Sequence, residues 1–310
     1  METRKALALA GRVSISAVIV FHLLRSADIQ ETVQSVLGSD RRVWISALSL
    51  YLLGQVVCSY KWGVIAAAAG FRNSLAGYLS YYFIGMFFNL FLPTTVGGDI
   101  VKCYYLANDD PRGRAAPAVY TVILERFTGL AVLVWMMAVA VLMPDGKNVP
   151  YAVKAPLFAA SALLMILTPF LPALGSIASR RFLWLRTVIR DIEVYWRNPR
   201  IITAALLWSL VFHLLFISVH ILIGKAVGIV APVSFYFIVY PAATLAGFVP
   251  VSLNGIGPRE AAYVALFQLA GVKQSDALAF GLMWLGVMIC GNLTGALFYI
   301  KMSGRGVFKT

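Results

Sequence analysis

The chain contains Asn89-Leu-Phe-Leu-Pro93-Thr-Thr-Val-Gly97-Gly98-Asp99-Ile-Val-Lys102 and, in its other half, Phe248-Val-Pro250-Val-Ser252-Leu-Asn254-Gly255-Ile-Gly257-Pro258-Arg259-Glu260. In both stretches an apolar run ends at a proline, and small polar residues, glycines and then opposite charges follow. Proline removes a backbone donor and glycine admits unusual dihedral angles. Irregular backbone persists inside a bilayer only where protein covers it or where it lines a wet cavity. Paired breaks in two halves therefore predict two re-entrant segments, an inverted repeat and a transporter-like binding site; the alternative is two surface loops.

The composition places these breaks inside a membrane. Of the 310 residues 60% are hydrophobic and only 13% are charged, against about 25% charged in a soluble domain, and the mean hydropathy is +0.82. So few charges exclude a disordered chain, a secreted disulfide scaffold, a DNA-binding domain and a soluble enzyme with one anchor. The net charge of +13 is typical of basic residues that flank spans and face anionic headgroups, so we expect no nucleic-acid partner.

Length sets the number of spans. A membrane-spanning helix needs about 20 apolar residues, so the chain has room for about eight. We therefore expect one all-α, multi-pass domain over residues 1–310, located in the cell membrane. The fifth span should end at Thr168, Pro169 and Pro172, and Lys61, inside the second, is expected to extend to an interface. The stretches expected to span are 6–24, 43–69, 75–92, 117–143, 152–173, 201–224, 232–249 and 276–300.

Residues 177–197 have a different pattern. Apolar residues recur there at spacings of three and four, which makes one apolar helical face, and most of the charges fall off that face. This predicts a basic amphipathic helix in the headgroup plane; the alternative is an ordinary basic loop. The apolar positions are Phe182, Leu185, Ile189, Ile192 and Trp196, and the charged ones are Arg181, Arg186, Arg190, Glu193 and Arg197.

Ionisable residues beside or inside spans are costly, and such groups normally find partners in the protein interior. Glu125 and Arg126 lie about nine residues into the fourth span. We expect Asp99 to cap a helix that begins near residue 100 and to pair with Arg126. Pro258 should begin a short helix whose N-terminus, with Arg259, forms an anion site, and Arg259 is a candidate partner for Glu125. A purely structural ion pair is equally compatible with the sequence.

These groups are predicted to converge on one cavity. Three acidic and two basic side chains would leave one carboxylate over, which could take up a proton, meet Lys102 or meet a cationic headgroup. The predicted binding residues are Asn89, Pro93, Gly97, Gly98, Asp99, Lys102, Glu125, Arg126, Asn254, Gly255, Gly257, Arg259 and Glu260.

Catalytic groups are scarce, and we expect no metal, no cofactor and no ATP motor. The three cysteines match no metal or redox spacing. His213 and His220 share a helix face, but no carboxylate lies near them in sequence. The sequence lacks a G-x-x-x-x-G-K-[ST] phosphate-binding motif. An integral-membrane headgroup transferase with Asp99 or Glu260 as the base remains the alternative, as does an accessory subunit of a lipid-modification pathway.

The ordered motifs resemble a known family. Asn89 to Pro93, Gly97-Gly98-Asp99, Glu125-Arg126-Phe127 and Pro250 to Glu260, with Leu266-Phe267 and Gly271 after them, are similar to the transmembrane region of lysylphosphatidylglycerol synthases, also called flippase-like or UPF0104. The resemblance covers nearly the whole chain.

The resemblance implies translocation of a lipid with an anionic or zwitterionic headgroup, such as an aminoacyl-phospholipid, a glycolipid or a polyprenyl-linked lipid, with a lipid-modifying enzyme as a further candidate partner. The soluble synthase domain of the family's aminoacylating members is not expected here, so a label of phosphatidylglycerol lysyltransferase would not fit. The resemblance also implies termini inside the cell, whereas the loop charges, counted with eight spans, place both termini outside.

Overall fold

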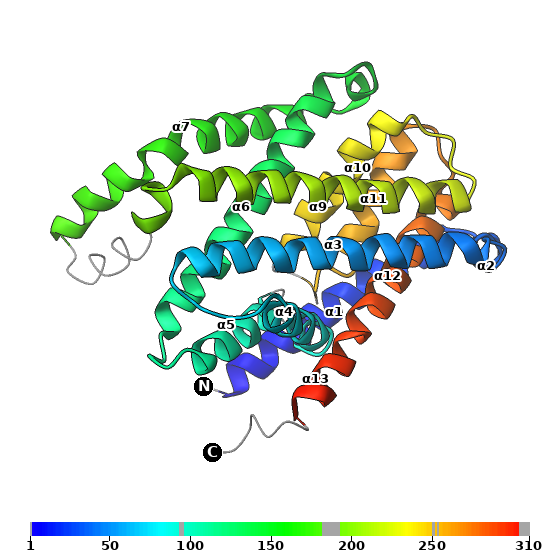
Figure 1. Cartoon of the computed structure of the whole chain (residues 1–310). Helices are drawn as coiled ribbons and strands as arrows, with labels where there is room; N and C mark the ends of the chain where they lie inside the picture. Colours follow the sequence, from blue (N-terminus) through cyan, green and yellow to red (C-terminus); the bar gives the residue numbers. More distant parts are fainter. Residues whose placement is uncertain (1, 93–95, 182–192, 250–251, 253, 304–310) are drawn as a thin grey trace.

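The computed structural model describes residues 2–92, 96–181, 193–249, 252 and 254–303, and these contain helices and connecting segments without a strand. The first half comprises α1 (Glu2–Ser26), α2 (Ile29–Leu37), α3 (Arg41–Ala68), α4 (Leu75–Asn89), α5 (Gly97–Asp109), α6 (Ala115–Leu142), a short 3-10 helix η1 (Pro144–Asn148) and α7 (Tyr151–Arg181). The second half comprises α9 (Pro199–Ala226), α10 (Val233–Phe248), α11 (Pro258–Leu269), α12 (Gln274–Leu293) and α13 (Gly295–Ser303). Figure 1 shows the arrangement of the helices.

Four helical stretches are long and apolar enough to cross a membrane: α3, α6, α9, and α12 with α13 as one run of 30 residues. Each of the other predicted spans is also helical, but α4 has 15 residues and α10 has 16. The first span continues into α2 after a bend of 95°. The chain is thus an all-α, polytopic membrane protein.

The helix boundaries follow from local chemistry. Asp40 and Ser74 precede α3 and α4, and their side chains accept hydrogen bonds from the backbone amides of Arg42 and Gly77, as N-cap residues do. Pro199 and Pro258 each occupy the first turn of a helix, where a missing amide costs nothing. The prediction that Pro258 begins a short helix is confirmed.

The two interrupted stretches fold back on the helices that precede them. α5 packs against α4, and α11 packs against α10, as expected for re-entrant segments. Around them α3 and α9 lie side by side along most of their length, and α6 crosses both (Figure 1). The inverted-repeat relation between the halves stays a prediction.

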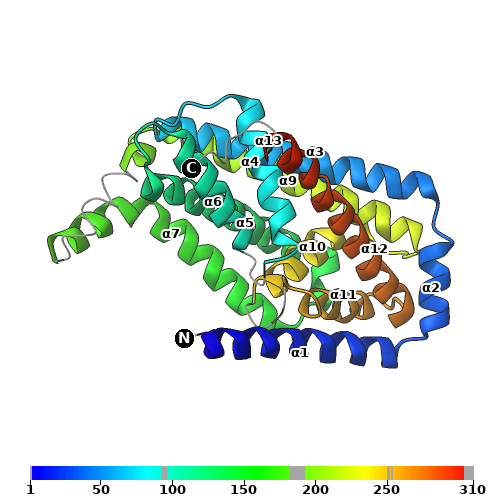
Figure 2. The same cartoon turned by 90° about the horizontal axis from the view of Figure 1, so that it is seen from below.

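The first two helices form an elbow around one side of the bundle. α1 runs along one edge, and α2 turns away from it toward α3 (Figure 2). Ser16 on α1 donates to the carbonyl of Ile256 at 3.0 Å. Glu31 on α2 accepts from Lys273 at 2.9 Å and from Ser275 at 2.8 Å, at the start of α12. α1 is therefore hydrogen-bonded to the second interrupted stretch, and α2 is bonded to the start of α12.

The region after the fifth span differs from the expectation. α7 does not end at Thr168-Pro169 but continues to Arg181. Residues 177–181 are thus the end of α7. Most of the predicted surface helix, residues 182–192, lies outside the described residues, so that helix stays a prediction. Trp196, which we placed on its apolar face, donates to the carbonyl of Thr168 at 3.3 Å.

Candidate functional site: a cation-lined cavity where the interrupted stretches meet

Asn89, the last residue of α4, joins the two interrupted stretches. Its side-chain oxygen accepts from the backbone amide of Gly98 at 2.7 Å, which satisfies one of the free amides at the start of α5. Its backbone carbonyl accepts from the side-chain amide of Asn254 at 2.5 Å. The stretches predicted to share one region are therefore in direct contact, although Pro93 lies outside the described residues.

The close approach around this junction requires glycine. A Cβ atom on Gly98 would lie 2.0 Å from the carbonyl oxygen of Gly85 on α4, so α5 can pack this tightly only without a side chain. Gly255 has a φ of +78°, and a Cβ there would lie 2.7 Å from the Cα of Gly247. Asn254 beside it also has a positive φ, of +52°, a conformation that asparagine tolerates better than most residues. The break in each half is therefore specified by its sequence.

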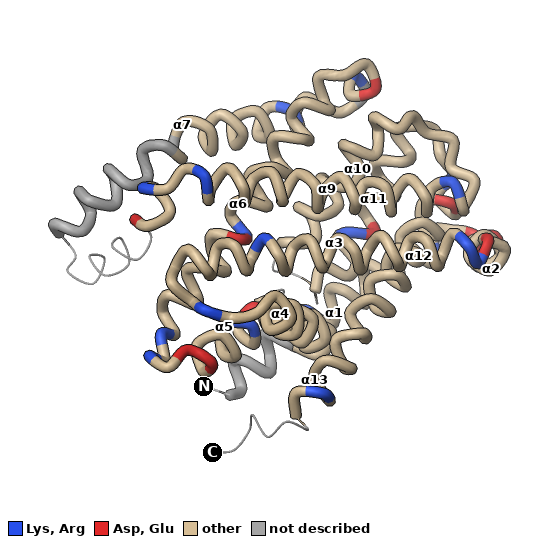
Figure 3. The backbone as a smooth tube through the Cα atoms, in the orientation of Figure 1, with Lys and Arg blue, Asp and Glu red and all other residues tan. Residues whose placement is uncertain are grey.

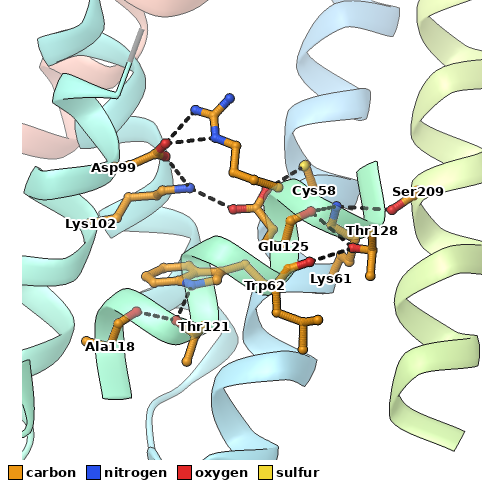
Figure 4. A network of polar contacts seen from close by, with 12 residues as sticks. Cys58, Lys61, Trp62, Asp99, Lys102, Ala118, Thr121, Glu125, Thr128 and Ser209 are labelled. Carbon is orange, nitrogen blue, oxygen red and sulfur yellow. Dashed lines mark hydrogen bonds and ion pairs between the residues drawn. The ribbon is translucent and has the colours of Figure 1, made fainter. Parts of the chain in front are cut away.

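A buried ion-pair network lies beside the junction. The amine of Lys102 on α5 is 3.0 Å from the Asp99 carboxylate and 2.9 Å from the Glu125 carboxylate on α6. All three side chains are at most 6% exposed. The Arg126 guanidinium is 2.7 Å from Asp99, which confirms the predicted pair. Figure 4 shows the Lys102 amine between the two carboxylates.

Lys61 belongs to this network, and the prediction that it extends to an interface is wrong. It is 2% exposed, and its amine donates to the backbone carbonyl of Glu125 at 2.9 Å and to Ser209 on α9 at 3.1 Å (Figure 4). The Cys58 thiol, one turn earlier on α3, donates to the Glu125 carboxylate at 3.2 Å. Most charged residues lie at helix ends and in loops, whereas this group lies among α3, α5 and α6 (Figure 3). A lysine in mid-span was the signal for this role.

Two predicted contacts are not formed. Arg259 does not pair with Glu125; its guanidinium donates to the carbonyl of Asn254 at 3.2 Å and to the sulfur of Met288 at 3.3 Å. Asp99 does not cap α5, because its carboxylate is held by Lys102 and Arg126 within the first turn.

The expected anion site at the start of α11 is occupied by the protein itself. The carboxylate of Glu260 accepts from the backbone amide of Gly257 at 2.6 Å and so stabilises the N-terminus of its own helix. Gly257 has a φ of +99° and faces Ile19 on α1. Gly97 is likewise buried, against Leu92.

The charged groups face a cavity of about 230 Å³ that is lined by residues of α3, α4, α6, α9, α10, α11 and α12. Its polar wall has three cations and one carboxylate: Lys61, Arg126, Arg259 and Glu125. The remainder of the wall is mainly aromatic and apolar, with Tyr51, Tyr82, Phe212, Phe216, Tyr240 and Trp284 among its residues. Arg126, Leu130 and Phe248 line the cavity and are also exposed at the protein surface. The cavity therefore opens to the surface of the protein beside α6 and α10.

The cavity gathers only part of the predicted cluster. Glu125, Arg126 and Arg259 line it, while Asp99 lies behind them with Lys102, and Glu260 is not among the lining residues. The sequence argument expected a spare carboxylate, but the wall carries an excess of positive charge because Asp99 and Glu260 do not line it and Lys61 does. The aromatic wall could not be foreseen, since its members are scattered over several apolar helices.

The two histidines hold hydrogen bonds within the helix bundle. His213 lies 2.8 Å from the hydroxyl of Tyr240 and 2.9 Å from the carbonyl of Gly129. His220 similarly lies 2.8 Å from the hydroxyl of Tyr263 and 2.8 Å from the carbonyl of Phe216. Both rings therefore use both nitrogens inside the protein.

A sequence model of the lysylphosphatidylglycerol synthase transmembrane region matches residues 9–293. The chain belongs to this family. A relative from Pyrococcus horikoshii, the UPF0104 membrane protein PH1989, is 23% identical over 183 residues. That match covers 57% of this chain and 54% of the relative, so it spans about half of the relative's length. The matched residues 9–293 include the interrupted stretches, the ion-pair network and the residues that line the cavity.

Proposed function

We propose that this membrane protein moves a lipid between leaflets by binding the lipid's phosphate headgroup in the cavity. The observation that carries the proposal is the cation-rich wall at the junction of the two interrupted stretches. Charged groups within spans are costly and mark substrate paths, and paired helix breaks mark transporter sites. A headgroup would meet Lys61, Arg126 and Arg259, and its tails would leave past Leu130 and Phe248.

The family supports this proposal without naming the lipid. We infer that the substrate has an anionic or zwitterionic headgroup, that the protein acts in the cell membrane, and that a lipid-modifying enzyme supplies or consumes the lipid. Aminoacyl-phospholipids, phosphate-bearing glycolipids and polyprenyl phosphates all carry the phosphate that the wall would bind.

The geometry favours transport over headgroup transfer. The transferase alternative needs Asp99 or Glu260 as a base. Asp99 is bound by two cations, Glu260 accepts from the amide of Gly257, and neither lines the cavity. An accessory subunit without activity of its own would show neither transport nor turnover.

Purified protein in liposomes tests the proposal. We expect fluorescent phospholipid to cross between leaflets faster than in empty liposomes, without chemical change. Arg259→Ala should reduce the rate by about ten-fold or more, since a hydrogen bond to a charged group contributes about 1.5–3 kcal/mol. Lys225→Ala, at the exposed end of α9, is the matched control and should leave the rate unchanged.

Two results would contradict the proposal. Equal rates with and without protein would exclude translocation under these conditions. A headgroup that is altered during the assay would instead support the transferase.

A further inference from the structure

Two cations that line the cavity, the buried Lys61 and the half-buried Arg259, form no ion pair with a carboxylate among the described residues. Among the described residues, Lys61 contacts a carbonyl and a hydroxyl, and Arg259 contacts a carbonyl and a sulfur. Neither forms an ion pair there, whereas Arg126 pairs with Asp99 and Lys102 with Asp99 and Glu125. A cation at bilayer depth is costly unless it finds a partner of opposite charge or water. Two of them facing one space indicate that an anion is part of the working site.

The charge of that anion follows from the wall. Lys61, Arg126 and Arg259 against Glu125 leave an excess of two positive charges. Counting the pair behind the wall, Asp99 and Lys102, changes nothing, because the two cancel. Glu260 is not in the wall; one of its carboxylate oxygens accepts from the amide of Gly257 at the N-terminus of α11, and the other has no hydrogen-bond partner among the described residues.

The polar wall also matches a group with many acceptors and no donor. The ammonium and guanidinium groups only donate, and Glu125 is already occupied by Lys102 and Cys58. The indole N–H of Trp284, which is 5% exposed and lines the cavity, has no acceptor among the described residues. A phosphate with three terminal oxygens can accept from several such donors at once. An ammonium headgroup would find no free carboxylate in this wall.

We propose that the preferred headgroup is a dianionic phosphate, that of a lipid phosphomonoester, rather than a phosphodiester or a cationic headgroup. This rests on the proposed function and specifies its substrate class. The volume of about 230 Å³ lies below the roughly 300–1,000 Å³ of sites for drug-sized ligands. The cavity therefore suits a phosphate itself better than a phosphate with a bulky polar substituent.

The test compares three ligands on the purified full chain by titration calorimetry in detergent: dihexanoyl phosphatidate, dihexanoyl phosphatidylglycerol and inorganic phosphate. At about pH 7.5 phosphatidate should bind about ten-fold tighter than phosphatidylglycerol, because it adds one charge in a partly desolvated site. Inorganic phosphate should bind much more weakly than phosphatidate, since it has no tails to leave past Leu130 and Phe248.

The pH dependence gives a second test that needs no variant. The second ionisation of a phosphomonoester has a pKa near 6, so phosphatidate, whose monoanion should bind about ten-fold more weakly, should lose about three-fold in affinity between about pH 7.5 and about pH 5.5. Phosphatidylglycerol has no such ionisation. Its affinity over the same range reports any change in the protein groups at the cavity, which are Cys58, Lys61, Tyr51, Tyr82, Glu125, Arg126, His213, Tyr240 and Arg259.

Variants then link the preference to the two cations. Arg259→Gln and Lys61→Gln should each reduce the ten-fold preference for phosphatidate to about two-fold or less, whereas Arg259→Lys, which keeps the charge, and Lys225→Gln should retain it. If the two lipids bind equally tightly and Arg259→Gln weakens the binding of both, the preference for a dianionic headgroup is overturned and the proposed function stands. Binding of neither lipid would overturn both. Inorganic phosphate that binds as tightly as phosphatidate would overturn the lipid as the source.

Discussion

Lys102→Met tests whether the ion-pair network stabilises the bundle. The Lys102 amine lies 3.0 Å from Asp99 and 2.9 Å from Glu125 and is 5% exposed. Methionine keeps the length of the side chain and removes the charge, so two carboxylates stay buried with one partner fewer each. Removal of one member of a buried ion pair costs about 3–5 kcal/mol. The lost contact of the amine with the Tyr82 ring, at 4.4 Å from the ring centroid, adds to this cost.

Thermal unfolding of the purified protein in detergent measures the effect. For a chain of this length we expect the Tm of Lys102→Met to fall by on the order of 10 °C. Addition of Glu125→Gln should recover much of this loss, because it removes the carboxylate left without its cation. Lys225→Met, at an exposed position, is the matched control. A Tm of Lys102→Met equal to that of the wild type, or a double variant no more stable than the single one, would refute the reasoning.

Three further expectations concern other parts of the chain. Gly98→Ala should destabilise by about 1–3 kcal/mol, as its Cβ would lie 2.0 Å from a carbonyl, while Gly11→Ala, within α1 and with nothing within 4 Å, should leave the Tm unchanged or raise it slightly in the same melting assay. The hydrogen bond from Arg114 lowers the pKa of Asp110; its stabilisation is present above the unfolded pKa of about 4 and is lost as pH falls through the lower folded value, so the Tm difference between wild type and Asp110→Asn should vanish toward about pH 3. Glutamine at four arginines of 177–197 should weaken the dependence of transport on anionic lipid, measured in liposomes with and without phosphatidylglycerol, since each contributes about 1 kcal/mol; these are Arg181, Arg186, Arg190 and Arg197.

Hydropathy predicted the helices because a bilayer demands long apolar stretches whatever the tertiary contacts are. Every predicted span is helical in the structure. The errors lie where tertiary packing or helix continuity decides the outcome. α7 continues past Thr168-Pro169 to Arg181, which the prolines did not indicate, and α2 turns by 95° in the stretch between the first two predicted spans.

The site was predictable in its location but not in its pairings. Both interrupted stretches were identified because proline, glycine and charged residues follow one another in the same order in each. The ion pair between Asp99 and Arg126 was predicted because an unpaired charge within a span is costly. The partner of Arg259 could not be derived, since it depends on how α11 and α12 pack. The role of Lys61 was missed because a mid-span lysine is compatible with either an interface or a buried polar contact, and only the positions of α6 and α9 decide between them.

Asn89 has a consequence for motion. One residue holds the start of α5 through its side chain and the second interrupted stretch through its carbonyl. While both bonds persist, the halves cannot open as two independent gates. The proposed transport would then either move both stretches together as one rigid unit or begin with the rupture of the hydrogen bond between Asn89 and Asn254. In the second case the lifetime of that bond would limit how often the cavity changes the leaflet it faces.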